Sequence, residues 1–301
     1  MNTATQQKPA RQQQHSQHTP KEAEVEADKA LTTQPAGALS APIDYAQDAG
    51  AGMEGVDKDS HAIPFLVVLQ PLSPVVVDRK VEGAAAGLLM NSVTQEFYPE
   101  AWVVPCAFQR RWIRWGARES GGGFKGEFTP AQAQEIVSKG EVKMLENRYY
   151  YPLPDGSINE KKSDRLTDTR SHYILVLREP KDELFQPMVF ALASTGIKVS
   201  KNFVARMESL KLRNPNSGAL YIPPSFSHMY PVKTEQKRND AGTWFLPVIG
   251  AAQRVENMAL YSAAKAFHAQ VIEGKVTAAV DSLHEGGEES AGASDGGQGG
   301  F

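Results

Sequence analysis

The sequence predicts a mainly β domain with a few helices, of the α+β class, between two disordered ends. Apolar runs in residues 61–280 are short, rich in β-branched and aromatic residues, and bounded by turn-forming residues, which is typical of strands. Apolar residues recur at helix spacing in only a few segments. Residues 1–60 contain one aromatic side chain, Tyr45, and residues 281–301 contain one, Phe301, so neither end can bury a core.

The 301 residues therefore divide into a disordered N-terminal arm (1–60), one folded domain (61–280) and a flexible acidic C-terminal tail (281–301). A domain of this length can bury a substantial core. No apolar run approaches the ~18 residues of a membrane span, and residues 1–20 contain no apolar segment of a secretory signal. The single cysteine, Cys106, excludes an internal disulfide framework. We expect a soluble, intracellular protein without membrane contacts.

The net charge of −3 conceals a basic body between two acidic ends. Residues 1–60 carry 5 Lys/Arg against 9 Asp/Glu, residues 61–280 carry 27 against 21, and residues 281–301 carry 0 against 5. A basic body with an acidic tail is typical of proteins that bind polyanions. An excess of this size is also ordinary for such a domain, so charge alone leaves both interpretations open.

The first half of the domain reads as a series of strands. The third of them continues to Trp115, which places Pro105 at a sheet edge or a bulge because proline cannot donate to a strand ladder. The predicted strands cover residues 63–69, 87–94 and 101–115, with a turn at 95–96.

One short helix carries clear boundary signals. Thr129 suits the N-cap, Pro130 the first helical position and Gly140 the C-terminal stop of a helix over residues 130–139. The rest of the domain alternates between extended and helical patterns. We expect extended chain at 142–151, 169–177, 188–193, 221–224, 228–234 and 244–249, a turn at 154–157, and helices at 200–212 and 253–275.

The motifs of common enzyme and metal sites are missing from the sequence. No two of the seven histidines have the i, i+4 spacing of a zinc-binding helix, and neither a phosphate-binding loop nor a Gly-x-Ser-x-Gly turn occurs. Asp164 and Asp168 lie in a charged stretch that we interpret as a solvated loop rather than a metal site. Cys106 lies in an apolar strand, where cysteine is usually a core residue. We therefore predict no enzyme activity, no cofactor and no metal.

Residues 108–118 combine arginines with aromatic rings and contain no acidic residue. Single-stranded nucleic acid requires this mixture, because guanidinium groups bind phosphates and flat rings stack on unpaired bases. A core tryptophan surrounded by surface arginines is the alternative interpretation. A strand would divide the segment into two faces, each containing arginine. One face carries Phe108, Arg110, Trp112 and Arg114; the other carries Gln109, Arg111, Ile113 and Trp115, and Arg118 follows.

Further basic residues extend this candidate surface. Phe124 and Lys125 follow the three glycines of residues 121–123, so a hairpin tip there is a candidate to close over a nucleic-acid strand. The remaining candidates lie in the predicted helix and in a later turn, and each is equally consistent with an ordinary solvated surface. They are Lys198 and Lys201, together with Lys233.

The acidic tail ends in a phenylalanine, Phe301. Such a ring at the end of a charged segment predicts docking of the ring and carboxylate on partner proteins. The acids are also expected to compete for the protein's own basic groove. A chance residue at a disordered end is the alternative.

Several local motifs resemble those of bacteriophage proteins from replication and recombination regions. The resemblance spans about residues 61–250, and its motifs are moderately specific. Those in the first half are at 62–70, 72–74, 83–87, 91–94, 103–105 and 108–115, and those in the second half are at 194–201, 230–234 and 242–244.

The overall arrangement is also similar to that of phage and bacterial single-stranded DNA-binding proteins, although the tip of the tail is less acidic and richer in glycine. That resemblance implies an elaborated OB-like β-barrel, binding of single-stranded DNA without strong sequence preference, and location in the host cytoplasm. It further implies contacts of the tail with a phage DNA polymerase, helicase or nuclease, and a possible homo-oligomer. The alternatives are a virion or internal structural protein and a strand-annealing recombination accessory.

Overall fold

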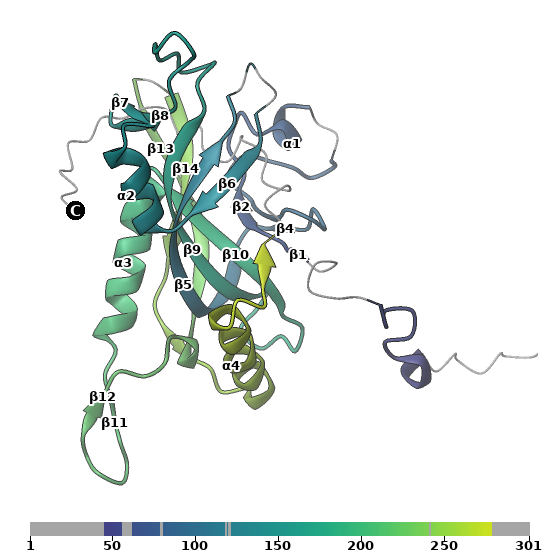
Figure 1. Cartoon of the computed structure of the whole chain (residues 1–301). Helices are drawn as coiled ribbons and strands as arrows, with labels where there is room; N and C mark the ends of the chain where they lie inside the picture. The colour runs from purple at the N-terminus through teal and green to yellow at the C-terminus, as the bar shows by residue number, and fades with distance from the viewer. Residues whose placement is uncertain are drawn as a thin grey trace, which may run out of the picture. The chain divides into compact units, whose positions relative to one another are not determined.

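The computed structural model describes residues 45–55, 62–78, 81–117, 119, 122–240 and 242–278. The chain divides into two compact units, residues 1–54 and 55–301. In the first unit the described residues form a short 3-10 helix, η1 (Tyr45–Asp48). All other described elements belong to the second unit (Figure 1). Most of the predicted arm and the whole predicted tail lie outside the described residues, so those two predictions remain expectations.

The second unit is built on an antiparallel sheet of nine described strands that curls into a half-barrel (Figure 1), which confirms the mainly β prediction. Its path runs β14-β13-β5-β9-β8-β7, with β10 paired to β9, β6 to β5 and β15 to β13. The strands are β5 (Ala101–Trp115), β6 (Phe124–Phe128), β7 (Lys143–Leu145), β8 (Arg148–Tyr150), β9 (Arg165–Leu177), β10 (Gln186–Ala193), β13 (His228–Asn239), β14 (Gly242–Ile249) and β15 (Gln253–Arg254).

The long strand β5 pairs with β9 over nearly its whole length and contains one irregularity. The register shifts between Pro105 and Ala107, so Cys106 has no partner residue on β9. A bulge accommodates the missing N–H of proline within a ladder. The predicted strand to Trp115 and the predicted bulge at Pro105 are both confirmed.

A small sheet of three strands packs against the open side of the half-barrel. Its strands are β2 (Leu66–Val68), β3 (Leu89–Asn91) and β4 (Phe97–Tyr98). A parallel bridge joins Phe65 to Val189 of β10. On the opposite side, the Gln70 side chain donates to the Phe245 carbonyl and accepts from the Phe245 N–H, each at 2.9 Å. The small sheet is thereby attached to both margins of the half-barrel.

Four α-helices occur in the described part of the chain, and two of them cover opposite faces of the sheet. Phe203 of α3 (Gly196–Ser209) packs in one core cluster with Tyr230 and Phe190. Leu260 and Phe267 of α4 (Met258–Ile272) pack in a second core cluster with Cys106 and Leu175. The remaining helices are α1 (Pro74–Val77) and α2 (Pro130–Ser138).

Local signals predict the start of α2 but not the ends of α3. Thr129 accepts from the Gln132 N–H in a capping box, with Pro130 at the first position, as the sequence predicts. The predicted helix at 200–212 instead begins at Gly196 and ends at Ser209. No helix in the described residues has the length and apolarity needed to cross a membrane.

The region 142–151, predicted as one strand, is the hairpin β7–β8. Glu146 and Asn147 form its turn and both have positive φ, as a tight two-residue hairpin turn requires. Two minor strand pairs and a 3-10 helix complete the described fold. Parallel strands β1 (Ala62–Ile63) and β16 (Thr277–Ala278) pair, antiparallel strands β11 (Leu212–Arg213) and β12 (Leu220–Tyr221) form a hairpin, and η3 (Ser225–Ser227) precedes β13.

Candidate nucleic-acid interface

The tryptophans of the aromatic–basic segment pack inside the molecule. Trp115 is only 5% exposed and meets Phe124 edge to face, with ring centroids 6.4 Å apart. Trp112 is half-buried in a cluster beneath α2 and meets Tyr149 at 5.9 Å. Ile113 and Trp115 therefore form the buried side of the alternation. Phe108 is the most exposed aromatic residue of the segment, with 41% of its surface accessible to solvent.

The arginines of β5 are paired with carboxylates. Arg110 donates to both oxygens of Asp168, from Nε at 3.0 Å and from Nη2 at 2.9 Å. Arg111 lies 2.7 Å from Glu127 of β6. Such pairs neutralise charge that a phosphate would otherwise encounter. Contact between these arginines and phosphates therefore stays a prediction, and the structure shows an alternative partner for each.

Asp164 is the centre of the densest of these ion-pair clusters. Its Oδ2 accepts from Arg114 at 2.6 and 2.9 Å, and its Oδ1 accepts from Lys125 at 2.8 Å and from the Ala117 N–H at 3.1 Å. Burial acts to raise the pKa of the Asp164 carboxyl, but these hydrogen bonds outweigh it and the net pKa is lowered. The Arg114 guanidinium also lies 3.9 Å from the centre of the Tyr151 ring.

Interpreting Asp164 and Asp168 as residues of a solvated loop was wrong. Asp164 is buried, and Asp168 lies on β9 with its side chain only 15% exposed. The acids lie about fifty residues or more from Arg110 and Arg114 in sequence, so local composition gave no sign of the pairing. Both are structural partners of basic residues.

The remaining predicted residues are dispersed over the molecule. Lys233 of β13 pairs with Glu100 at 2.5 Å. Arg118 and Phe301 lie outside the described residues. Phe124 and Lys125 do lie beside the β5 segment, on β6, as the sequence suggested. The structure does not bring Lys198, Lys201 or Lys233 into the Asp164 cluster.

The first turns of α3 carry basic residues of a different kind. Lys198 and Lys201 are both exposed, and neither forms an ion pair with any described residue. Their three-residue spacing places them on the solvent side, opposite Ser200 and Phe203. Among the predicted site residues, these two lysines have a positive charge that no described acidic residue neutralises through an ion pair.

The hairpin β11–β12 follows α3 and extends away from the sheet (Figure 1). Exposed Lys211 and Arg213 lie just before and on its first strand, and Tyr221, which is 45% exposed, lies on its second strand opposite Leu212. Sequence reasoning missed this hairpin. The signal was available in the turn-forming run Asn-Pro-Asn-Ser-Gly at 214–218 between two basic residues and an apolar stretch. We call Lys198, Lys201, Lys211, Arg213 and Tyr221 the α3–hairpin surface.

A buried histidine anchors α3 to the sheet. His172 of β9 is fully buried, and its Nε2 lies 2.8 Å from the Ser200 hydroxyl of α3. Burial lowers the pKa of His172 to about 4, so the imidazole is neutral at physiological pH. Its ring also packs against Phe203 at 5.3 Å. The hydrogen bond and the ring contact fix the rotation of α3, which keeps the two lysines facing solvent.

Comparison with models of known protein families gives a match. A family model described as Pam3 phage gp34-like protein matches residues 31–277. The chain belongs to this family. No curated protein and no solved structure matches it.

Membership of the Pam3 phage gp34-like family confirms the broad part of the sequence resemblance, a bacteriophage protein. The matched range contains the half-barrel, all four described α-helices and the β11–β12 hairpin. Both the ion-paired segment of β5 and the α3–hairpin surface therefore lie within the region shared with the family.

Proposed function

We propose that this phage protein binds single-stranded DNA without strong sequence preference, as a non-enzymatic component of phage DNA replication or recombination. The observation that carries the proposal is the α3–hairpin surface, which combines exposed basic residues without ion-pair partners among the described residues with an exposed ring on one continuous segment of the chain. Proteins of this kind combine a positively charged track with stacking side chains. The acidic tail belongs to the proposal as a handle for a replication partner.

The proposal assigns the electrostatic part of binding to Lys198, Lys201, Lys211 and Arg213. For single strands each neutralised phosphate contributes roughly 0.7 to the slope of log affinity against log salt. Arg110, Arg111 and Arg114 would have to exchange a carboxylate for a phosphate, which offsets most of the gain. The exposed lysines release counterions without that exchange.

The proposal assigns base stacking to Tyr221. Its ring is 45% exposed where β12 of the projecting hairpin ends, so a nucleobase can lie on the ring without unfolding the core. Base–aromatic stacking is worth about 1–3 kcal/mol per base. The buried rings of Trp112 and Trp115 contribute to the fold in the unbound protein.

The test is a fluorescence titration with oligo-dT at two salt concentrations. The variant K198Q/K201Q is expected to lose about 1.4 from the salt slope, since two phosphate contacts are removed. K265Q is the matched control, because Lys265 is an exposed lysine of α4 on another face of the sheet. No oligo-dT binding by the wild-type protein, or equal slopes for the three proteins, would refute the proposal.

A virion or internal structural role is the second candidate, and the exposed apolar residues at the base of the same hairpin favour it. Leu220 and Ile222 flank Tyr221 and are 62% and 53% exposed. An exposed apolar group of this kind often marks a protein interface. Co-purification of the protein with phage particles, together with absence of oligo-dT binding, would select this role.

A further inference from the structure

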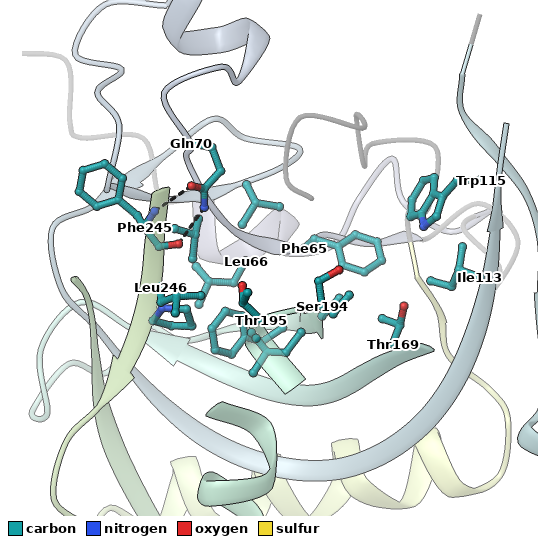
Figure 2. Close-up of a pocket in the computed structure, with 18 of the residues that line it drawn as sticks. Phe65, Leu66, Gln70, Ile113, Trp115, Thr169, Ser194, Thr195, Phe245 and Leu246 are labelled. Carbon is teal, nitrogen blue, oxygen red and sulfur yellow. Dashed lines mark hydrogen bonds between the residues drawn. The ribbon is translucent and has the colours of Figure 1, made fainter. Parts of the chain in front are cut away.

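A cavity of about 110 Å³ lies at the start of α3. Figure 2 shows Ile113 and Trp115 on one side of it, Gln70 and Phe245 on the other, and Phe65 between them. Thr195 and Gly196, the residues at the beginning of α3, also line it. The cavity belongs neither to the Asp164 cluster nor to the β11–β12 hairpin.

The size of the cavity limits its occupant. A cavity of roughly 150 Å³ in another protein accepts benzene, whereas drug-sized ligands need about 300–1,000 Å³. A space of about 110 Å³ that opens to solvent therefore suits a single six-membered ring. The aromatic walls, Phe65, Phe190, Phe245 and Trp115, favour a flat occupant.

The walls combine fixed and unsatisfied polar groups. Gln70 is fully engaged, because both ends of its amide are bonded to the Phe245 backbone (dashed lines in Figure 2). The Trp115 Nε1–H, in contrast, is buried and has no acceptor among the described residues. A buried donor without an acceptor costs about 1–3 kcal/mol. An occupant with a carbonyl oxygen would relieve that cost.

The place of the cavity relates it to the α3–hairpin surface. Thr195 and Gly196 line the cavity, and Lys198 and Lys201 lie within the next two turns of the same helix. A polyanion that follows these lysines passes the end of α3 where the cavity begins. A flat ring carried on that polyanion is then close to the aromatic walls.

We propose that this cavity holds one pyrimidine base of the bound single strand, an inference that rests on the proposed function. A pyrimidine is a single flat ring with carbonyl oxygens, which matches the volume, the aromatic walls and the unsatisfied indole N–H. A purine has two fused rings and exceeds the space. The cavity thus adds a preference for pyrimidines to otherwise sequence-independent binding.

The first test compares dT and dA oligonucleotides of equal length. Wild-type protein is expected to bind dT at least about fivefold more tightly, which corresponds to the lower end of the base-stacking free energy. A193L fills the cavity, since Ala193 lines it on β10, and is expected to lose this preference while keeping the salt slope. A266L is the matched control on exposed α4, and thermal unfolding establishes that both variants fold.

The second test uses the monomers dTMP and dAMP, so it does not depend on binding along α3. The indole N–H signal of Trp115 in an NMR spectrum, assigned with W115F, is expected to shift with dTMP and not with dAMP. Absence of oligonucleotide binding by wild type would refute the proposed function. Equal binding of dT and dA, a preference retained in A193L, or no indole shift with dTMP would each refute the cavity assignment alone.

Discussion

Asp164→Asn is the substitution that most directly tests the ion-paired interpretation of the β5 segment. The change keeps the size of the side chain and removes the negative charge that Arg114 and Lys125 share. It leaves two cations beside a buried site without a counter-charge. If these basic residues stabilise the fold, the variant will be less stable while its DNA affinity changes little.

The expected loss of unfolding free energy in Asp164→Asn lies between two known limits. Breaking a fully buried ion pair costs about 3–5 kcal/mol, and an exposed pair is worth about 0–1 kcal/mol. The Asp164 side chain is 9% exposed, but those of Arg114 and Lys125 are 35% and 41% exposed. We therefore expect the free energy of unfolding to fall by roughly 2–3 kcal/mol. For a domain of this size that lowers Tm by roughly 4–12 °C.

Urea denaturation at pH 7 measures this loss, with Glu135→Gln as the control. Glu135 pairs with Lys139 on α2, and both side chains are about 60% exposed, so its loss is expected to stay within ~0.5 kcal/mol. The lowered pKa of Asp164 gives stability that is present above the ordinary value of 3.8 and is lost as pH falls below it. The difference between wild type and variant must therefore narrow below that pH. A loss under ~0.5 kcal/mol at pH 7 would show that the cluster does not stabilise the fold.

Three further predictions concern His172, Gly87 and Trp115. The pKa of His172 is about 4 in the fold against 6.5 in the unfolded chain, so stability is expected to fall by about 3 kcal/mol between pH 6.5 and 4; His172→Phe should flatten this part of the pH–stability curve, and an unchanged curve would contradict the assignment. Gly87→Ala is expected to cost more than Gly83→Ala, although both have positive φ, because a Cβ at Gly87 would lie 2.6 Å from the Phe245 ring; equal melting temperatures would contradict this. Trp115→Ala is expected to cost about 3–5 kcal/mol of unfolding free energy because the ring is buried, and unchanged urea denaturation would contradict it.

Local chemistry was sufficient to predict several elements from the sequence. The α2 boundaries follow from Thr129 and Pro130, because capping depends on neighbouring residues only. The bulge at Pro105 follows from the missing backbone donor. The extended segments predicted at 169–177 and 188–193 lie within β9 and β10, two β-rich runs that are close in the chain and pair with each other. In each case the determining residues lie within a few positions of one another or in adjacent segments.

The candidate site was harder to predict, because it depends on register between distant strands. Arg110 meets Asp168 only because the β5–β9 ladder brings residues 58 positions apart together. The run of arginines has no acidic residue nearby in the sequence, so it indicated a free basic surface. In the folded protein, acidic residues from distant parts of the chain pair with these arginines. Lys198 and Lys201 were identified from sequence, but their lack of a described partner required the structure. The β7–β8 turn lacks glycine, and of its two positive-φ residues only Asn147 is of a type that favours this conformation, so the sequence signal for the turn was weak.

The unpaired residue in β5 also decides where the strand can lose a single residue. Beyond the bulge the alternation places Ile113 and Trp115 on the buried side and Arg114 toward Asp164. Deleting Cys106 would remove the bulge and leave every later residue opposite the same β9 partner, because Pro105 and Ala107 already face consecutive residues of β9, Ile174 and Tyr173. Deleting a single residue beyond the bulge would instead exchange the two sides of all later positions, and arginine would then point into the core. A one-residue deletion in β5 is thus expected to be tolerated at Cys106, whereas beyond it length changes are expected in steps of two residues.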